Sequence, residues 1–259
     1  TIGDVGAMLL MSGKSFAIGE AGMFVTDDIE IYERAIAWAH YGRFNQDLQT
    51  EYLREWAGLP LGGHKYRMHQ LSAAMGRVQL KYYDERSAEI RKSMNYFWDL
   101  LEGVPGIKPH RPAKDSGSNM SGWYAARGLY RPEEVEGLSV TRFCEAVRAE
   151  GASTSPGLNK PLHLHPLLNT VDVYNHGKPT RIANSDRDLR QPMGSLPVSE
   201  AVATRTYSIP WFKHCDAAVI ENQAAAYRKV AENHKELLAD DPGNGAQMGG
   251  WGLFAQQRA

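Results

Sequence analysis

Apolar and polar positions in the N-terminal part of the chain predict two strands followed by a helix. Residues 1–10 end in an apolar run and are expected to form a buried strand, and Phe24–Thr26 form a second, short strand. Asp27 followed by Glu30 is typical of a helix start, so a helix is predicted from there to about His40. The apolar face expected for this helix consists of Ile29, Tyr32, Ile36 and Ala39.

One long helix is predicted from Met68 to about Leu101, because apolar residues recur there at steps of three and four. About 34 residues at 1.5 Å each give a length of roughly 50 Å, more than one compact domain buries evenly. We therefore interpret this helix as a link between two domains. The stretch before it, Tyr41 to Lys65, is interrupted by glycines and a proline and is expected to be a functional or interface loop.

The second half of the chain alternates short strands and helices, which is typical of an α+β domain. Residues 123–130 are predicted to be a strand, Ser139 to cap a helix that ends near Ala149, and residues 152–154 to form a return strand. Residues 206–210 are a further predicted strand, and the last helix is expected to begin near Asp216.

Composition narrows the functional classes. The 259 residues carry a formal net charge of −1, which gives no electrostatic attraction for nucleic acid or an anionic membrane. No apolar run approaches the roughly 20 residues of a membrane span, and the first residues lack the basic segment of a signal peptide. The two cysteines, Cys144 and Cys215, are too few for a disulfide framework, so a cytoplasmic protein is expected.

Lys14 is the candidate catalytic residue. It lies among small residues and precedes a Gly-Glu-Ala-Gly turn, residues 19–22, where the backbone is able to approach another group closely. Burial or a nearby cation lowers the pKa of a lysine amine and makes it nucleophilic, as Schiff-base chemistry requires. A solvated surface lysine is the alternative interpretation, and local composition alone favours it.

Three segments together resemble one family. Lys14 with the Gly-Glu-Ala-Gly turn and Phe24–Asp28 is similar to the lysine block of the DegT/DnrJ/EryC1/StrS aminotransferases. Residues 63–80 (GHKYRMHQLSAA, then VQL) resemble a second block, and residues 195–212 (SLPVSE, then SIPWF) resemble a third. The resemblance implies the C-terminal part of a fold-type I pyridoxal 5'-phosphate (PLP) transferase, an α/β protein.

This resemblance implies a domain organisation. The expected parts are the remainder of the PLP-binding large domain with its interface loop, a long linking helix, a small α+β domain and a flexible tail. Their residue ranges are 1–66, 67–102, 103–240 and 241–259.

The family also implies roles for individual residues. Its lysine, here Lys14, forms the internal aldimine with PLP. The family places a phosphate-binding serine where this chain has Leu9, so Ser12 is the candidate substitute. An asparagine of the family contacts the cofactor phosphate of the partner subunit, and Lys65 occupies its position, where it binds phosphate as a point charge or is a solvated loop lysine.

His163 and His165 fall in a region that borders the active-site mouth in the family, which implies substrate contact. Structural roles are the alternative for both. An H-x-H pair on a strand places both rings on one face, which zinc would accept, but no further ligand is suitably spaced, so no metal is expected.

The function implied is transfer of an amino group from glutamate or glutamine to a keto sugar or cyclitol. In the family the lysine lies near the middle of the chain, whereas here it is residue 14, so a second polypeptide is expected to supply the missing half. The alternatives are a non-catalytic subunit that stabilises an active homologue and a PLP-dependent sugar dehydratase.

Overall fold

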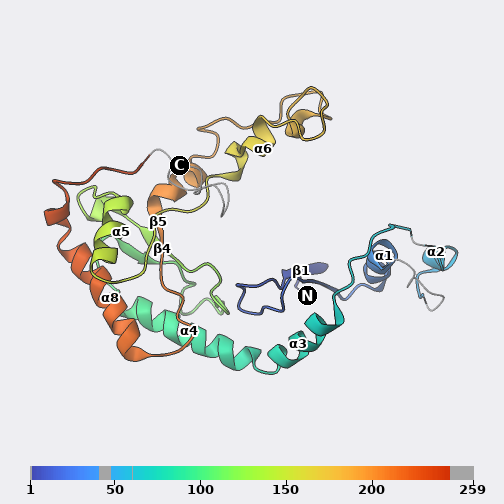
Figure 1. Ribbon diagram of the computed structural model, residues 1–259, viewed down its shortest axis with the longest axis horizontal. Helices are drawn as coiled ribbons and strands as arrows, with labels where there is room; N and C mark the ends of the chain where they lie inside the picture. The colour runs from blue at the N-terminus through green and yellow to red at the C-terminus, as the bar shows by residue number, and fades with distance from the viewer. Residues whose placement is uncertain (1, 41–47, 60, 246–259) are drawn as a thin grey trace. The chain divides into compact units, whose positions relative to one another are not determined.

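The computed structural model describes residues 2–40, 48–59 and 61–245, which form two compact units (Figure 1). The first unit is Thr1–Ala88 and the second is Glu89–Ala259. The division into domains at residues 66 and 102 stays a prediction. None of the helices in the described part of the chain is both long and apolar enough to cross a membrane.

The first unit begins with an antiparallel hairpin of β1 (Val5–Leu9) and β2 (Gly22–Thr26). Both strands were predicted, but the expectation that the first is buried is wrong. Most of the side chains of β1 are exposed, because β2 is its only strand partner among the described residues.

Helix α1 (Ile29–Ala39) follows the hairpin. Asp28 caps it rather than Asp27, since its carboxylate accepts from the backbone N–H groups of Glu30 and Ile31 at 2.8 and 3.0 Å. The predicted apolar face is also wrong, because the buried residues of α1 are Glu33 and Ala37. The remaining helix before residue 66 is α2 (Glu51–Arg54).

The helix predicted to run from Met68 to about Leu101 is two helices, α3 (Gln70–Leu80) and α4 (Tyr83–Leu100). At the break, Lys81 N–H donates to Val78 O and Tyr82 N–H donates to Gln79 O. These bonds span three residues instead of four, so the chain tightens into a turn and leaves the α-helical path. Apolar spacing does not reveal such a break, because the spacing continues across it.

The second unit contains an antiparallel sheet in the order β3 (Ile107–Pro109), β4 (Arg127–Tyr130), β5 (Thr206–Ser208). The predicted return strand at 152–154 is wrong. The chain instead meets β5 through a single bridge between Pro156 and Tyr207. A proline has no N–H for a continuing ladder, which limits the pairing to this bridge.

Helices α5 (Val140–Ala149) and α8 (Ala217–Glu232) pack together in the second unit (Figure 1). Both predicted starts are confirmed, since Ser139 Oγ accepts from Arg142 N–H at 3.1 Å and Asp216 Oδ1 accepts from Val219 N–H at 3.2 Å. The other helical segments of this unit are α6 (Pro166–Asn169), α7 (Pro197–Ala201) and the single turns Pro132–Glu134, Leu162–Leu164, Thr180–Ile182, Val202–Arg205 and His234–Leu237.

Aromatic rings fill the core between these helices and the sheet. Phe143 of α5, Tyr207 of β5 and Tyr227 of α8 are fully buried, with ring centroids 5.6–6.2 Å apart. Gly128 of β4 makes room for this cluster, because a Cβ at that position would lie 2.3 Å from Cζ of Tyr207. Large aromatic side chains therefore set the packing of sheet against helices.

The last described residues are attached to α5. Asp241 accepts from Ser139 N–H at 2.7 Å and from Ser139 Oγ at 2.6 Å, and Asn244 Oδ1 accepts from Thr141 N–H at 3.4 Å. The start of the predicted flexible tail, from residue 241 to Asn244, is thus attached to the N-terminal end of α5. Its remainder, 246–259, lies outside the described residues.

Candidate functional site

Lys14 lies in the loop that joins β1 to β2. Leu10 N–H donates to Ala21 O and Ile18 N–H donates to Leu10 O, both at 2.9 Å, so the ends of the loop continue the hairpin. Lys14 N–H donates to Met11 O at 3.3 Å and closes a turn. Gly13 has a φ of +89°, which favours glycine.

The side chain of Lys14 is half-buried, and that of Ser12 in the same turn is exposed. The structure therefore brings two of the predicted site residues, an amine and a hydroxyl, into one short turn. Leu9, at the position of the family's serine, is an exposed apolar residue of β1 and offers no donor to a phosphate.

Helix α3 holds this loop in place. Ile18 is buried, and a Cβ on Gly76 would lie 3.5 Å from its Cγ2, so the helix approaches the loop closely. Gln79 Nε2 donates to Ala17 O at 2.6 Å. An amine is held in position only if the backbone that carries it is fixed. These contacts fix the backbone at Ala17, three residues after Lys14.

Phe16 adds an edge-to-face contact with Tyr83, with centroids 5.4 Å apart. Sequence reasoning assigned no role in the site to Gln79 or Phe16. The available signal was a polar glutamine within the apolar pattern of the helix, but its partner is a backbone carbonyl 62 positions away. Such a contact follows from tertiary structure alone.

Lys65 lies in the same unit, at a cavity of about 530 Å³ that Lys14 does not line. Its side chain is exposed, and its backbone forms an isolated bridge with His40. His69 caps α3, since its Nδ1 accepts from Leu71 N–H at 3.2 Å. The lining is mostly basic or amide side chains, which suits an anion, and it consists of His40, Lys65, Arg67, Met68, His69 and Gln70.

His163 lies in the second unit and is buried. It belongs to a 3₁₀ turn rather than a strand, and its Nε2 lies 2.9 Å from Glu200 Oε1. Burial raises the pKa of Glu200, but the backbone N–H groups of Leu196 and Gly194 and the ring of His163 outweigh it and hold this pKa below its ordinary value. His163 and Glu200 therefore join two loops.

His165 has a different environment. It is half-buried, and its Nδ1 accepts from Leu167 N–H at 3.0 Å, which caps α6. The H-x-H pair therefore does not present two rings on one strand face. Within residues 2–40, 48–59 and 61–245, no three histidine, cysteine or acidic side chains are grouped to hold a metal ion.

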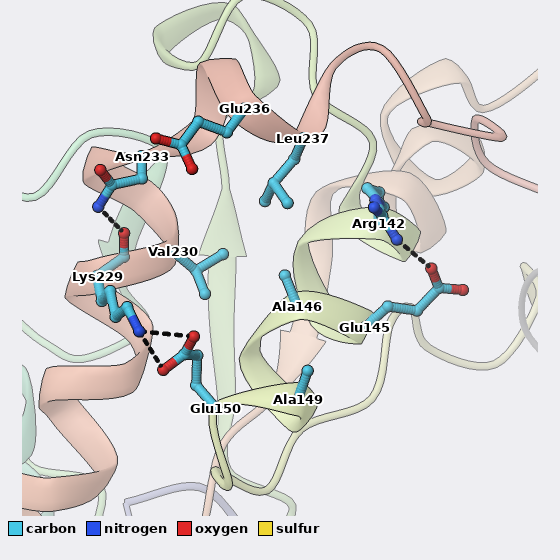
Figure 2. A pocket seen from close by; sticks show the side chains of 10 residues that line it. All are labelled: Arg142, Glu145, Ala146, Ala149, Glu150, Lys229, Val230, Asn233, Glu236 and Leu237. Atoms are coloured by element: carbon cyan, nitrogen blue, oxygen red, sulfur yellow. Dashed lines mark hydrogen bonds and ion pairs between the residues drawn. The ribbon is translucent and has the colours of Figure 1, made fainter.

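A separate cavity of about 380 Å³ lies between α5 and α8 (Figure 2). Figure 2 shows Lys229 turned toward Glu150, with Nζ 2.7 Å from Oε2, and Arg142 toward Glu145 at 3.6 Å. Val230 contributes to the apolar part of the wall. None of the predicted site residues lines this cavity, and these charged groups pair with one another, so we assign it no catalytic role.

Residues 1–226 match the DegT/DnrJ/EryC1/StrS aminotransferase family. The chain belongs to this family. Enzymes of the DegT/DnrJ/EryC1/StrS family are PLP-dependent.

Relatives in the family are similar along most of this chain. An uncharacterized protein from Methanocaldococcus jannaschii is 28% identical over 242 residues, which cover 90% of this chain and 55% of the relative. The L-glutamine:2-deoxy-scyllo-inosose aminotransferase of Streptoalloteichus tenebrarius is 26% identical over 252 residues, covering 92% and 56%. The chain thus spans about half the length of the curated relatives it matches.

Solved structures of the family confirm the predicted α/β fold of PLP-transferase type I. An aminotransferase from Psychrobacter cryohalolentis matches with a TM-score of 0.69 at 18% identity, covering 90% of this chain and 57% of that one. DesI, determined in the presence of its TDP-sugar product, matches with a TM-score of 0.65 at 22% identity, covering 93% and 53%.

The donor groups of the Lys14 turn fit PLP. The cofactor offers an aldehyde that combines with a primary amine and a phosphate that accepts hydrogen bonds, and the turn carries an amine on Lys14 and a hydroxyl on Ser12. The basic lining of the Lys65 cavity suits a phosphate as well.

Proposed function

We propose that this chain acts in PLP-dependent transamination, in which an amino acid such as glutamate or glutamine donates its amino group to a keto sugar or cyclitol. The observation that carries the proposal is the half-buried Lys14 on a turn fixed to α3 by Ile18 and Gln79. Membership of the family supports it, and so does the named activity of the Streptoalloteichus relative.

Each proposed residue has one task. PLP, when bound, supplies an electron-withdrawing ring that stabilises negative charge next to the amino group. Lys14 binds the cofactor covalently through Nζ, and once released it holds and moves a proton as general base. Ser12 donates a hydrogen bond to the phosphate, and Lys65 contributes a positive charge to a phosphate.

Substrate contact by the two histidines stays a prediction. The half-buried ring of His165 is the better candidate, because His163 is buried and bonded to Glu200. For His163 we propose a positioning role, in which its bond to Glu200 keeps the loop after residue 160 in place.

Borohydride trapping tests the proposal directly. The purified chain is incubated with PLP, reduced and digested, and peptide masses are measured. We expect the mass added by reduced PLP on the peptide that contains Lys14, and its loss in Lys14→Ala. Lys81→Ala is the matched control, because Lys81 is an exposed lysine at the end of α3.

Labelling that is equal on Lys14 and Lys81, or that survives Lys14→Ala, would contradict the proposal and favour the non-catalytic subunit. The related proteins give no support to a second polypeptide, and native mass spectrometry of the purified protein tests for one.

The dehydratase alternative is favoured by no observation among the described residues. A cytoplasmic location stays a prediction.

A further inference from the structure

A cavity in the second unit lies between α4 and the segment from residue 111 to 123. Its volume is about 290 Å³, near the lower limit of roughly 300 Å³ for small-molecule sites. It contains none of the residues proposed for transamination. Its charged lining residues are three basic side chains, Arg91, Arg111 and Lys114, and one acidic side chain, Asp99, and the rest of the wall is neutral.

One side of this cavity is a fixed network around Arg111. Its Nη1 donates to Asn95 O at 3.2 Å and to Asn95 Oδ1 at 3.3 Å, and its Nη2 donates to Asp99 Oδ1 at 2.7 Å. Lys114 Nζ lies 3.5 Å from the same oxygen. The single carboxylate of the cavity is therefore already neutralised, and it does not repel an anion strongly.

Arg91 also lines the cavity but takes no part in this network. It is half-buried on α4, and among the described residues its guanidinium has no hydrogen-bond or ion-pair partner. Three cations, Arg91, Arg111 and Lys114, thus face one carboxylate. A guanidinium presents paired N–H groups that match the oxygens of a phosphate or carboxylate.

Asn119 of the wall also suits a ligand that accepts hydrogen bonds. Asn119 Oδ1 accepts from Ser121 N–H at 2.8 Å, so its amide N–H groups are the part that a ligand can use. The indole of Trp123 is buried, and its Nε1 has no acceptor among the described residues. This nitrogen is covered by protein atoms, so the hydrogen bonds offered to a ligand come from the amide of Asn119.

We propose that this cavity binds a small molecule through a phosphate or carboxylate group, with Arg91 as the main contact and Lys114 and Asn119 beside it. The cavity has room for an anionic group together with further atoms of a small molecule, and its excess of positive charge disfavours a cationic ligand. This site is additional to the proposed transamination and does not depend on it.

Isothermal titration calorimetry with inorganic phosphate tests the proposal, with chloride added to keep the ionic strength constant. We expect saturable binding at this cavity, which Arg91→Met weakens about tenfold or more, because charge-assisted bonds are lost. Lys114→Met is the second variant, since its side chain is 76% exposed and its loss does not threaten folding. It is expected to weaken binding a few-fold. A parallel titration with acetate shows which of the two anionic groups is preferred.

Two controls separate this site from other cationic positions. Lys92→Met removes a charge from the next, exposed residue of α4 and is expected to leave binding unchanged. Lys65→Met removes the proposed cofactor-phosphate contact in the first unit, so it identifies any phosphate that binds there and should keep the part of the binding that Arg91→Met removes. Equal effects of Arg91→Met and Lys92→Met, or binding that only Lys65→Met abolishes, would overturn the proposal.

Discussion

Two neighbouring tyrosines in the core of the second unit differ in whether their hydroxyl groups form a hydrogen bond. Tyr207 and Tyr227 are both fully buried, with centroids 5.8 Å apart. Tyr227 Oη donates to Ser153 O at 2.8 Å and lies 3.2 Å from Ser208 O. Tyr207 Oη is buried and has no partner among the described residues. Burial raises the pKa of both phenols, so each hydroxyl keeps its proton.

Substitution by phenylalanine should therefore have opposite effects at the two positions. Tyr227→Phe removes a satisfied hydrogen bond and leaves Ser153 O without this donor, so we expect a loss of about 1 kcal/mol in the free energy of unfolding. The Tyr207 hydroxyl is buried without a hydrogen bond, and this burial destabilises the folded state by about 1–3 kcal/mol. Tyr207→Phe removes that hydroxyl. We expect that variant to gain about 1 kcal/mol. Neither change leaves a large cavity, because the ring remains.

Hydrogen exchange of the α8 amides measures this difference, because slow exchange there reports the opening of the second unit rather than of the whole chain. The two variants should differ by about 2 kcal/mol in the free energy of opening. If Tyr207→Phe destabilises α8 as much as Tyr227→Phe does, the assignment of an unmet hydroxyl to Tyr207 is refuted.

Two more changes test the core and the loops of the second unit. Gly128→Ala places a Cβ 2.3 Å from Tyr207 Cζ and should lower the free energy of unfolding by about 3 kcal/mol. Gly245→Ala is the control, because its Cβ has no atom within 4 Å, and it should be neutral. Equal melting temperatures of the two variants would contradict this. Because the pKa of Glu200 is lowered in the folded state, the unfolded chain binds the proton more tightly, and stability should fall as the pH drops below about 4.3 toward the folded pKa. Glu200→Gln should flatten this acid limb in a pH series of unfolding curves, and an unchanged limb would show that Glu200 does not cause it.

Local chemistry in the sequence predicted the parts of the fold that depend on neighbouring residues. Ser139 and Asp216 cap helices because a short polar side chain reaches a backbone N–H three residues on. Burial was harder to predict. Glu33 is a buried carboxylate because it accepts from the backbone N–H groups of Gln49 and Thr50 at 2.7 and 2.8 Å, partners that no helical pattern reveals.

In the candidate site, too, neighbouring residues were predictable from the sequence and contacts between distant segments were not. Lys14 and Ser12 share one turn, so sequence proximity was enough to place them together. The H-x-H spacing predicted a shared face for His163 and His165, but a 3₁₀ turn between two prolines separated their roles. Gln79 reaches the Lys14 loop only because α3 packs on it. Contacts between distant segments decided what residue spacing did not.

The β1–β2 hairpin has a practical consequence for anyone who purifies this chain. Met8 and Leu9 on one strand and Met23 and Phe24 on the other are each about half exposed, and successive residues of a strand point to opposite sides. Apolar residues on both faces are typical of an inner strand of a larger sheet, and a two-stranded ribbon is barely stable in water. The isolated chain is therefore expected to aggregate and to adsorb to surfaces. Low protein concentrations and mild detergent are suitable conditions for handling it.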